Sequence, residues 1–168
     1  MTTSALTVSI RAYAHSDYDS CLGVFDSNVP KYFAPAERSD FVSFLHVPNA
    51  EFVVAEREGS VIGCGGWYSR DLIGRLCWGM IHSAMHRTSA GSALLQFRLD
   101  RLFSVTETDE VRFDTSQHTA AFFSKFGFVI DGVESEGFAS GIDCVRMSIS
   151  RQEWLRRRGN ASFVANAD

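Results

Sequence analysis

The sequence lacks the long apolar run and the targeting signals that mark membrane and secreted proteins. No stretch approaches the roughly 20 apolar residues that a membrane-spanning helix needs. The N-terminus, "MTTSALTVSIRAYA", has no basic segment followed by a long apolar one, so no secretory signal is predicted. We therefore expect no membrane association and a cytoplasmic location.

Excess basic charge is also absent. The chain has 16 Lys and Arg against 20 Asp and Glu, a formal net charge of -4 and a pI near 5.7. Nucleic-acid binding relies on clustered positive charge, so DNA and RNA are not expected partners. Neither G-x-G-x-x-G nor G-x-x-x-x-G-K-[ST] occurs, which argues against a dinucleotide or nucleoside-triphosphate site.

Cysteine is scarce and widely spaced. Cys21, Cys64, Cys77 and Cys144 form no C-x-x-C pair and have no histidine at metal-ligand spacing. Neither a zinc site nor a disulfide framework is therefore predicted. We expect these side chains to be buried as small apolar groups.

The chain does contain enough apolar residues for a single core. Its 168 residues are 45% hydrophobic, and no repeat, low-complexity segment or Gly/Pro-rich linker interrupts them. We expect one domain over residues 1–150, followed by a partly disordered C-terminal tail at 151–168 that begins as a short helix.

Hydrophobic periodicity predicts an α/β (α+β) arrangement of strands and helices. A hairpin turn is expected at Glu58-Gly59, and Gly127 is expected to end a helix. The strand, turn, helix and strand at 75–115 form a parallel crossover. The predicted strands are 6–12, 51–57, 60–69, 75–82, 109–116, 128–135 and 142–150, and the predicted helices are 15–25, 37–45, one that follows residue 89, and 118–126.

The segment "MHRTSAGSALLQF", residues 85–97, carries the first chemical signal. It passes from a predicted strand through small polar residues into a helix, where the first N–H groups lack intrahelical partners and the helix dipole is positive. Such a turn is able to bind an anion. The alternative is that Ser89 only caps the helix.

Two segments together resemble the GNAT acetyltransferase family over the span from Val8 to Ile149. Residues 86–91, "HRTSAG", resemble the family's R/Q-x-x-G-x-G/A turn, with His86 in place of Arg or Gln and Ser89 in place of the first Gly. The later segment "DTSQHTAAFFSKFGF" resembles the family's second block, aligned at Phe122, Phe123, Lys125, Gly127 and Phe128. The resemblance implies a mixed central sheet of about six to seven strands, splayed central parallel strands and about four helices.

The resemblance also implies a co-substrate, acetyl-coenzyme A, whereas the residue spacing predicts no metal. Its diphosphate would lie over the turn, and its pantetheine arm would pair with the preceding strand. The residues implied in its binding are Met80, Ile81, His86, Arg87, Thr88, Ser89, Ala90, Gly91, Ser92 and Phe123. The acceptor is an amine of a small molecule or peptide, and the last two strands are expected to supply a homodimer contact.

The catalytic residues stay open at this stage. The family often has a Tyr at the position of Phe123, so the acid that protonates the leaving thiolate would be water or a hydroxyl such as Ser116 or Thr115. His82 and His118 are candidates for the base. The alternative is that none of these residues has a chemical role. Phe123 would then be an ordinary core aromatic, and each histidine would be a surface or cap residue.

Residues around the loop "VPKYFAPA" are a further hypothesis. Asp26 and Glu37 flank this loop and are candidates to attract a cationic acceptor.

Two classes of function remain. The first is an N-acetyltransferase, and the second is a non-catalytic acyl-coenzyme A-binding sensor of the same fold, which the missing Tyr keeps open. Turnover of acetyl-coenzyme A with an amine distinguishes them.

Overall fold

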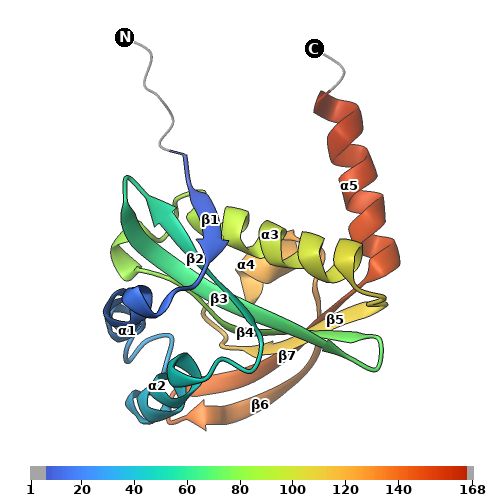
Figure 1. Cartoon of the computed structure of the whole chain (residues 1–168). Coiled ribbons are helices and arrows are strands. Elements are labelled where there is room, and N and C mark those ends of the chain that lie inside the picture. Colours follow the sequence, from blue (N-terminus) through green and yellow to red (C-terminus); the bar gives the residue numbers. More distant parts are fainter. Residues whose placement is uncertain (1–6, 166–168) are drawn as a thin grey trace. The chain divides into compact units, whose positions relative to one another are not determined.

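A computed structural model describes residues 7–165 (Figure 1). The strands are β1 (Ser9–Ala12), β2 (Glu51–Arg57), β3 (Ser60–Arg70), β4 (Ile73–Ile81), β5 (Glu110–Thr115), β6 (Val129–Ala139) and β7 (Ile142–Ser150). The α-helices are α1 (Tyr18–Ser27), α2 (Arg38–His46), α3 (Ala90–Val105), α4 (Ala120–Lys125) and α5 (Arg151–Ala165). Short 3-10 turns are η1 (His15–Asp17), η2 (Pro35–Glu37) and η3 (Ser83–Met85). The predicted order of strands and helices is confirmed up to β7.

The chain divides into two compact units. The first contains the residues up to Tyr68 together with Leu76–Arg101, and the second contains Ser69–Arg75 together with the residues from Leu102 onward. Three elements, β3, β4 and α3, therefore begin in one unit and end in the other. The single domain expected over residues 1–150 stays a prediction.

The strands form a mixed seven-stranded sheet in the order β1-β2-β3-β4-β5-β7-β6. In the first unit β2 pairs antiparallel with both β1 and β3. In the second unit β4 pairs parallel with β5, as the predicted crossover requires, and β7 pairs antiparallel with β5 and β6. The parallel ladder joins Ile73–Arg75 to Glu110–Arg112, whereas β4 itself continues to Ile81.

Two turn predictions are confirmed by the backbone. Glu58 and Gly59 both have positive φ, 50° and 77°, as a two-residue hairpin turn between β2 and β3 requires. Gly127, with φ 99°, follows the C-cap residue of α4, Phe126, at the position where a left-handed residue ends a helix. In both places the sequence supplies glycine where an L side chain would be strained.

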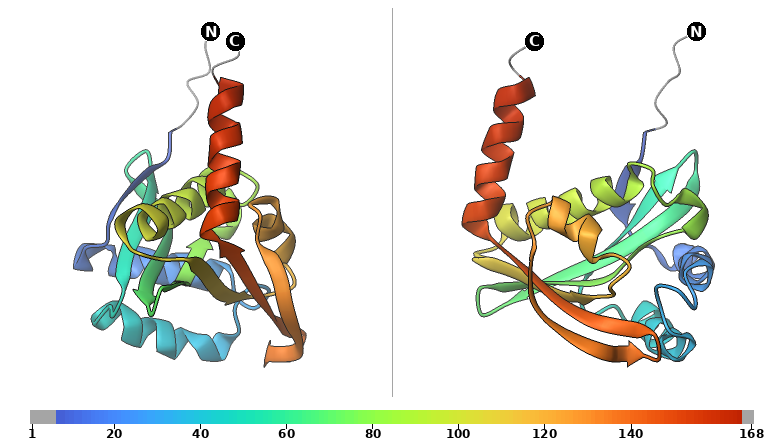
Figure 2. Two further views of the ribbon diagram at one scale, coloured as in Figure 1. Left: turned by 90° about the vertical axis from the view of Figure 1, so that its right-hand side faces the viewer. Right: turned by 180° about the vertical axis from the view of Figure 1, so that it is seen from behind.

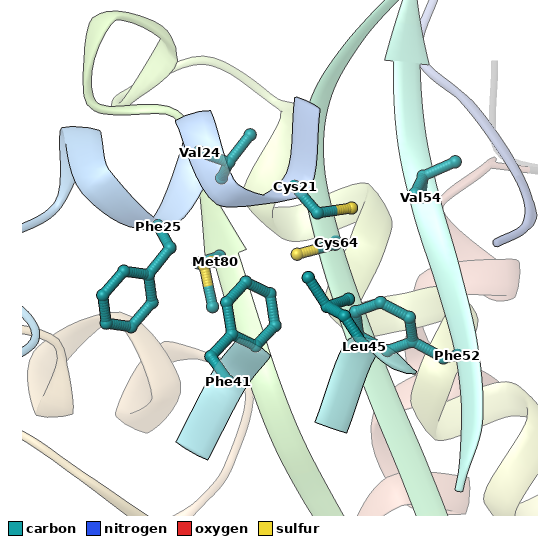
Figure 3. Packing of buried hydrophobic residues seen from close by; sticks show 9 residues of the cluster. All are labelled: Cys21, Val24, Phe25, Phe41, Leu45, Phe52, Val54, Cys64 and Met80. Atoms are coloured by element: carbon teal, nitrogen blue, oxygen red, sulfur yellow. The ribbon is translucent and has the colours of Figure 1, made fainter. Parts of the chain in front are cut away.

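The core of the first unit lies between α1, α2 and the strands (Figure 3). It consists of Cys21, Val24, Phe25, Phe41, Leu45, Phe52, Val54, Cys64 and Met80. Burial raises the pKa of the Cys64 thiol, which lies against Cys21. These thiols therefore behave as small apolar groups, as predicted, and Cys144 is buried as well, whereas Cys77 is half-buried.

Aromatic packing and α5 organise the second unit. The ring of Phe113 on β5 makes edge contacts with Phe123 at 4.4 Å and Phe128 at 5.1 Å. α5 begins directly after β7 (Figure 2), and Trp154 on α5 stacks on Phe103 at 6.1 Å. The Arg151 guanidinium donates to the Phe103 carbonyl at 2.6 Å. The segment after β7 thus starts with a packed helix.

No described helix is long and apolar enough to cross a membrane.

Asp17 gives the first unit an acid-sensitive ion pair, which leads to a prediction. Its carboxylate is 6% exposed and accepts two bonds from the Arg11 guanidinium, at 2.8 and 2.9 Å, and one from the Ala14 N–H at 2.9 Å. The Arg11 bond holds the pKa of Asp17 below its ordinary value of 3.8. A depressed carboxyl pKa stabilises the fold above that ordinary value, and this stabilisation is lost as pH falls through the lower folded pKa.

Asp17→Asn should therefore lower the free energy of unfolding at pH 7 by about 1–3 kcal/mol, the range for a lost buried charge-assisted bond. Urea titrations at pH 7 and pH 3 should show the difference from wild type shrinking at the lower pH. Asp19→Asn, on an exposed residue two positions away, is the matched control. An equal difference at both pH values contradicts the prediction.

Candidate active site

The predicted anion turn lies between η3 and α3 in the first unit. Arg87 has φ 61°, whereas Ser89 is outside the left-handed region, so the turn is made without glycine at position 89. The Thr88 hydroxyl donates to the Met85 carbonyl at 2.8 Å and accepts from the Ala90 N–H at 3.3 Å. Arg87, Thr88 and Ser89 are exposed. A cationic side chain and two hydroxyls therefore surround the start of a 16-residue helix.

Ser89 directly precedes α3, and a side-chain cap by Ser89 stays a prediction. Its carbonyl accepts the Ala93 N–H at 3.0 Å, the first intrahelical bond. Helical geometry leaves the N–H groups of Gly91 and Ser92 without intrahelical acceptors. This backbone bond is therefore compatible with an anion site at the start of α3.

The end of β4 is fixed by hydrogen bonds to its last carbonyl. The Ile81 oxygen accepts from Asn28 Nδ2 and from His86 Nε2, both at 2.9 Å. Asn28 is 3% exposed and also donates to the Val24 carbonyl of α1 at 2.8 Å. The His86 ring, which meets Tyr32 edge-on at 5.0 Å, thus holds the turn against β4.

His82 has a capping role. The ring Nδ1 of His82 accepts the Ala84 N–H at 3.1 Å. The backbone N–H of His82 donates to the Ile62 carbonyl at 2.8 Å. A neutral imidazole has one basic nitrogen. In His82 that nitrogen is already occupied, which weakens the case for His82 as the base.

A backbone irregularity lies in β4 at Trp78. This residue has φ 48°, a conformation that is strained for a bulky side chain. Its ring packs on Phe41 at 5.0 Å and on Phe33 at 6.3 Å. The aromatic cluster of α1 and α2 therefore stabilises an irregular strand directly before Met80 and Ile81, the residues expected to bind the pantetheine arm.

A buried arginine, 4% exposed, anchors α3 to β3 and β4. Arg98 donates two bonds to the Gly66 carbonyl, at 3.1 and 2.8 Å, and one to the Cys77 carbonyl at 3.1 Å. A Cβ built at Gly79 would lie 2.4 Å from Nη1 of Arg98. Burial lowers the pKa of Arg98 to about 10, so the guanidinium remains charged at neutral pH.

In the second unit, Ser116 stands out because its hydroxyl has no partner. The residue is 4% exposed, and its Oγ makes no hydrogen bond among the described residues. An unpaired buried hydroxyl costs about 1–3 kcal/mol, and such groups often mark functional sites. The Ser116 carbonyl is used, because it accepts the Ala120 N–H at 3.2 Å.

The connection from β5 to α4 is held by Gln117. Its Nε2 donates to the Gly141 carbonyl at 2.8 Å, and its Oε1 accepts the Asp143 N–H at 2.9 Å. This connection is therefore tied to the β6–β7 hairpin. The Thr115 hydroxyl bonds to that of Thr119, and His118 is exposed.

Phe123 behaves as a packing residue within its unit. It is half-buried, and its ring contacts Phe113, Phe122 and Phe128. This environment agrees with the core interpretation of the missing Tyr. A role for Phe123 beside the thioester stays a prediction.

The acidic residues beside the α1–α2 loop are already engaged. Asp26 pairs with Arg38 at 2.7 Å, and Glu37 accepts the Ala34 N–H at 2.8 Å as a helix cap. Both carboxylates thus have partners within this region, and a role in attracting a cationic acceptor stays a prediction.

Three site features were not predicted from the sequence: Asn28, Arg98 and the bend at Trp78. The sequence does contain a signal for Arg98, because this charged residue interrupts the apolar helix face formed by Leu94, Leu95 and Leu102. No sequence signal distinguishes Asn28 from an ordinary helix-end residue. The described residues contain no group of His, Cys, Asp and Glu that would hold a metal.

Comparisons with known proteins agree on one family. Residues 29–151 match the model described as an acetyltransferase (GNAT) domain. No curated protein sequence matches the chain.

Solved structures share the fold. A GCN5-related N-acetyltransferase from Kribbella flavida is 17% identical, with 85% of this chain and 97% of that chain covered and a TM-score of 0.71. The ribosomal-protein-S18-alanine N-acetyltransferase from Escherichia coli is 14% identical, with 86% and 94% covered and a TM-score of 0.71. The structure of yncA from Salmonella typhimurium with its cofactor acetyl-CoA is 14% identical, with 86% and 94% covered and a TM-score of 0.68.

Proposed function

The chain belongs to the GNAT acetyltransferase family, and from that membership we propose how its own residues carry out acetyl transfer. It is an N-acetyltransferase that uses acetyl-coenzyme A as co-substrate and an amine as acceptor. The roles of individual residues, given below, are our proposal.

The turn at residues 86–92 is proposed to bind the diphosphate of coenzyme A. The Thr88 hydroxyl donates its one proton to the Met85 carbonyl. The observation that carries this assignment is the start of α3, where first-turn N–H groups, the exposed Arg87 and the Ser89 hydroxyl meet. Each donates to or attracts phosphate oxygens. His86 would not contact the phosphate, because its Nε2 is already bonded to the Ile81 carbonyl.

The end of β4 is proposed to bind the pantetheine arm and to supply an oxyanion donor. Met80 and Ile81 lie beyond the ladder with β5, so main-chain pairing with an added extended segment is the natural use of this strand. The Ile81 carbonyl already accepts bonds from Asn28 and His86, and the donors that the backbone offers are its N–H groups. A backbone N–H near the thioester oxygen would stabilise the negative charge that develops there.

Proton transfer is assigned to the connection between β5 and α4. We propose that Ser116 donates a hydrogen bond to the departing sulfur, since its buried hydroxyl has no partner within the described part of the chain. His118, an exposed imidazole two residues after Ser116, is proposed to take the proton that the amine loses. Direct attack then forms the amide bond and breaks the C–S bond.

Assembly and location are proposals of the same kind. A homodimer contact through the last two strands is supported by exposed apolar side chains on β6, at Val129, Ile130 and Val133. A cytoplasmic location stays a prediction.

Acetyl-coenzyme A should raise the melting temperature of the protein. A ligand that binds only the folded state adds RT ln(1 + [L]/Kd), about 2.7 kcal/mol at a hundredfold excess over Kd. Differential scanning fluorimetry over a cofactor series measures the shift. No shift at millimolar cofactor would contradict the assigned binding function.

The variant Gly91→Val tests whether acetyl-coenzyme A binds at the turn before α3. A branched side chain in the first turn of α3 would intrude where the backbone must approach the diphosphate, so the shift should largely disappear. Ser104→Val, near the other end of α3, is the matched control and should keep the full shift. Equal shifts in wild type and Gly91→Val would refute the assignment of the turn.

A further inference from the structure

A cavity of about 380 Å³ lies within the second unit, on the strands rather than on a loop. Its volume falls in the range of small-molecule sites. The lining residues are Arg75 at the start of β4, Glu110, Arg112, Phe113 and Asp114 on β5, Asp131 on β6, and Arg146 and Met147 on β7. These strands lie side by side in Figures 1 and 2.

Strand register holds the charged side chains of this cavity together. Glu110, Arg112 and Asp114 alternate along β5 and therefore share one face. Asp114 is opposite Arg146 in the ladder with β7, and Arg112 is opposite Arg75 in the ladder with β4. The charges are thus arranged by the sheet.

A glycine on β6 makes room for one of these cations. A Cβ built at Gly132, the ladder partner of Arg146, would lie 3.0 Å from Nη2 of Arg146. The guanidinium therefore lies over Gly132, where a larger side chain would crowd it.

The cavity contains three guanidinium groups and three carboxylates, yet few of them are paired. Arg112 and Glu110 form an ion pair at 2.8 Å, which lowers the pKa of Glu110. Among the residues that the structure describes, Arg75, Arg146, Asp114 and Asp131 form no ion pair within 4.0 Å. Two cations and two anions of the lining are therefore available to a ligand.

This balance selects the ligand by its charge. A simple anion that met Arg75 and Arg146 would also meet Asp114 and Asp131, and a simple cation would meet the reverse conflict. A molecule with both signs can place an acid group against guanidinium, where bidentate bonds are favourable, and an ammonium group against carboxylate.

We propose that this cavity binds a small zwitterion, a molecule of amino-acid size with an acid group and an amine, and that this molecule is the acetyl acceptor. The inference rests on the acetyltransferase function above. In the reaction the amine nitrogen bonds to the acetyl carbon, the thioester C–S bond breaks, and coenzyme A leaves as the thiol with the proton that the nitrogen loses.

Calorimetry on the full-length protein tests binding. The probes are the twenty L-amino acids, with propylamine and propionate as fragments that carry one charge each. At least one amino acid should bind, and both fragments should bind at least tenfold more weakly than it does. Arg146→Gln and Asp114→Asn should each weaken that binding at least tenfold.

Arg156→Gln is the matched control, since this exposed arginine of the second unit lies outside the cavity and pairs with Glu153. It should bind the amino acid as wild type does. The absence of any amino-acid binding, or affinities that Arg146→Gln and Asp114→Asn leave unchanged, would overturn the proposal.

A thiol-release assay with acetyl-coenzyme A then tests the acceptor role. The bound amino acid should be acetylated, and both cavity variants should raise its KM. Binding without acetylation would overturn the acceptor assignment. The melting shift with acetyl-coenzyme A tests the cofactor site separately, so failure of this inference and failure of the proposed function are distinguishable.

Discussion

Arg98→Met should lower the free energy of unfolding by about 3 kcal/mol. The guanidinium makes three hydrogen bonds to the Gly66 and Cys77 carbonyls, and bonds to charged groups contribute roughly 1.5–3 kcal/mol each. Removing the buried charge offsets part of this loss. The pKa of Arg98 falls from 12.5 to about 10, which corresponds to roughly 3 kcal/mol of relieved desolvation. The lost bonds outweigh that relief.

Urea unfolding of the variant measures this change. Arg101→Met is the matched control, because Arg101 is an exposed residue of the same helix, and its substitution should cost less than about 0.5 kcal/mol. A neutral or stabilising effect of Arg98→Met would show that the desolvation cost exceeds the value of the three bonds.

A double-mutant cycle with Gly79→Ala tests the contact itself. In wild type the new methyl group would lie 2.4 Å from Nη1 of Arg98, so Gly79→Ala alone should be strongly destabilising. In the Arg98→Met background the flexible methionine can move aside, and the same substitution should cost at least 1 kcal/mol less. Additive effects would contradict direct coupling between residues 79 and 98.

Arg98 lies on the helix that begins at the proposed diphosphate turn, so its contacts bear on function. The same helix carries the turn assigned to the diphosphate at its N-terminus, and Arg98 fixes the helix to Gly66 and Cys77. Arg98 is therefore a positioning residue. Its side chain holds the strand next to Trp78 and the helix in one arrangement.

The elements of this fold follow from local sequence patterns. The bounds of β2 and β7 are those predicted, 51–57 and 142–150, because alternation and turn residues define both ends. β6 was expected to end at residue 135, but it continues to Ala139 past an irregularity in its register and a left-handed Glu136, φ 53°. A bulge of this kind depends on the partner strand, which a local pattern does not describe.

The position of the turn at residues 86–91 was likewise predictable from the sequence. The contacts that each of its side chains makes were not. His86 was expected to occupy a phosphate-binding position, which stays a prediction, and no spacing indicates that its Nε2 bonds to the Ile81 carbonyl. Ser89 replaces a glycine without strain because the left-handed residue is Arg87. The unpaired Ser116 hydroxyl is a property of tertiary packing, which no spacing of residues reveals.

Ser116→Ala should slow acetyl transfer by about tenfold to a hundredfold while leaving the fold as stable as wild type or more so. General acid assistance contributes typically 10²–10⁴-fold, and because a thiolate is already a fair leaving group, the expected effect lies at or below the lower end of that range. Removing a buried hydroxyl that has no partner among the described residues costs no hydrogen bond to them. A residue with a purely structural role would not combine a lower rate with unchanged stability.

The measurement is the single-turnover transfer rate across pH, with an acceptor identified by thiol release. It isolates the chemical step, whereas steady-state turnover can be limited by product release. Ser124→Ala, on an exposed serine of α4, is the control and should leave the rate unchanged. A wild-type transfer rate for Ser116→Ala over the whole pH range would contradict the prediction, and the thiolate would then leave with help from water. The unpaired Ser116 hydroxyl would then have no role in the reaction.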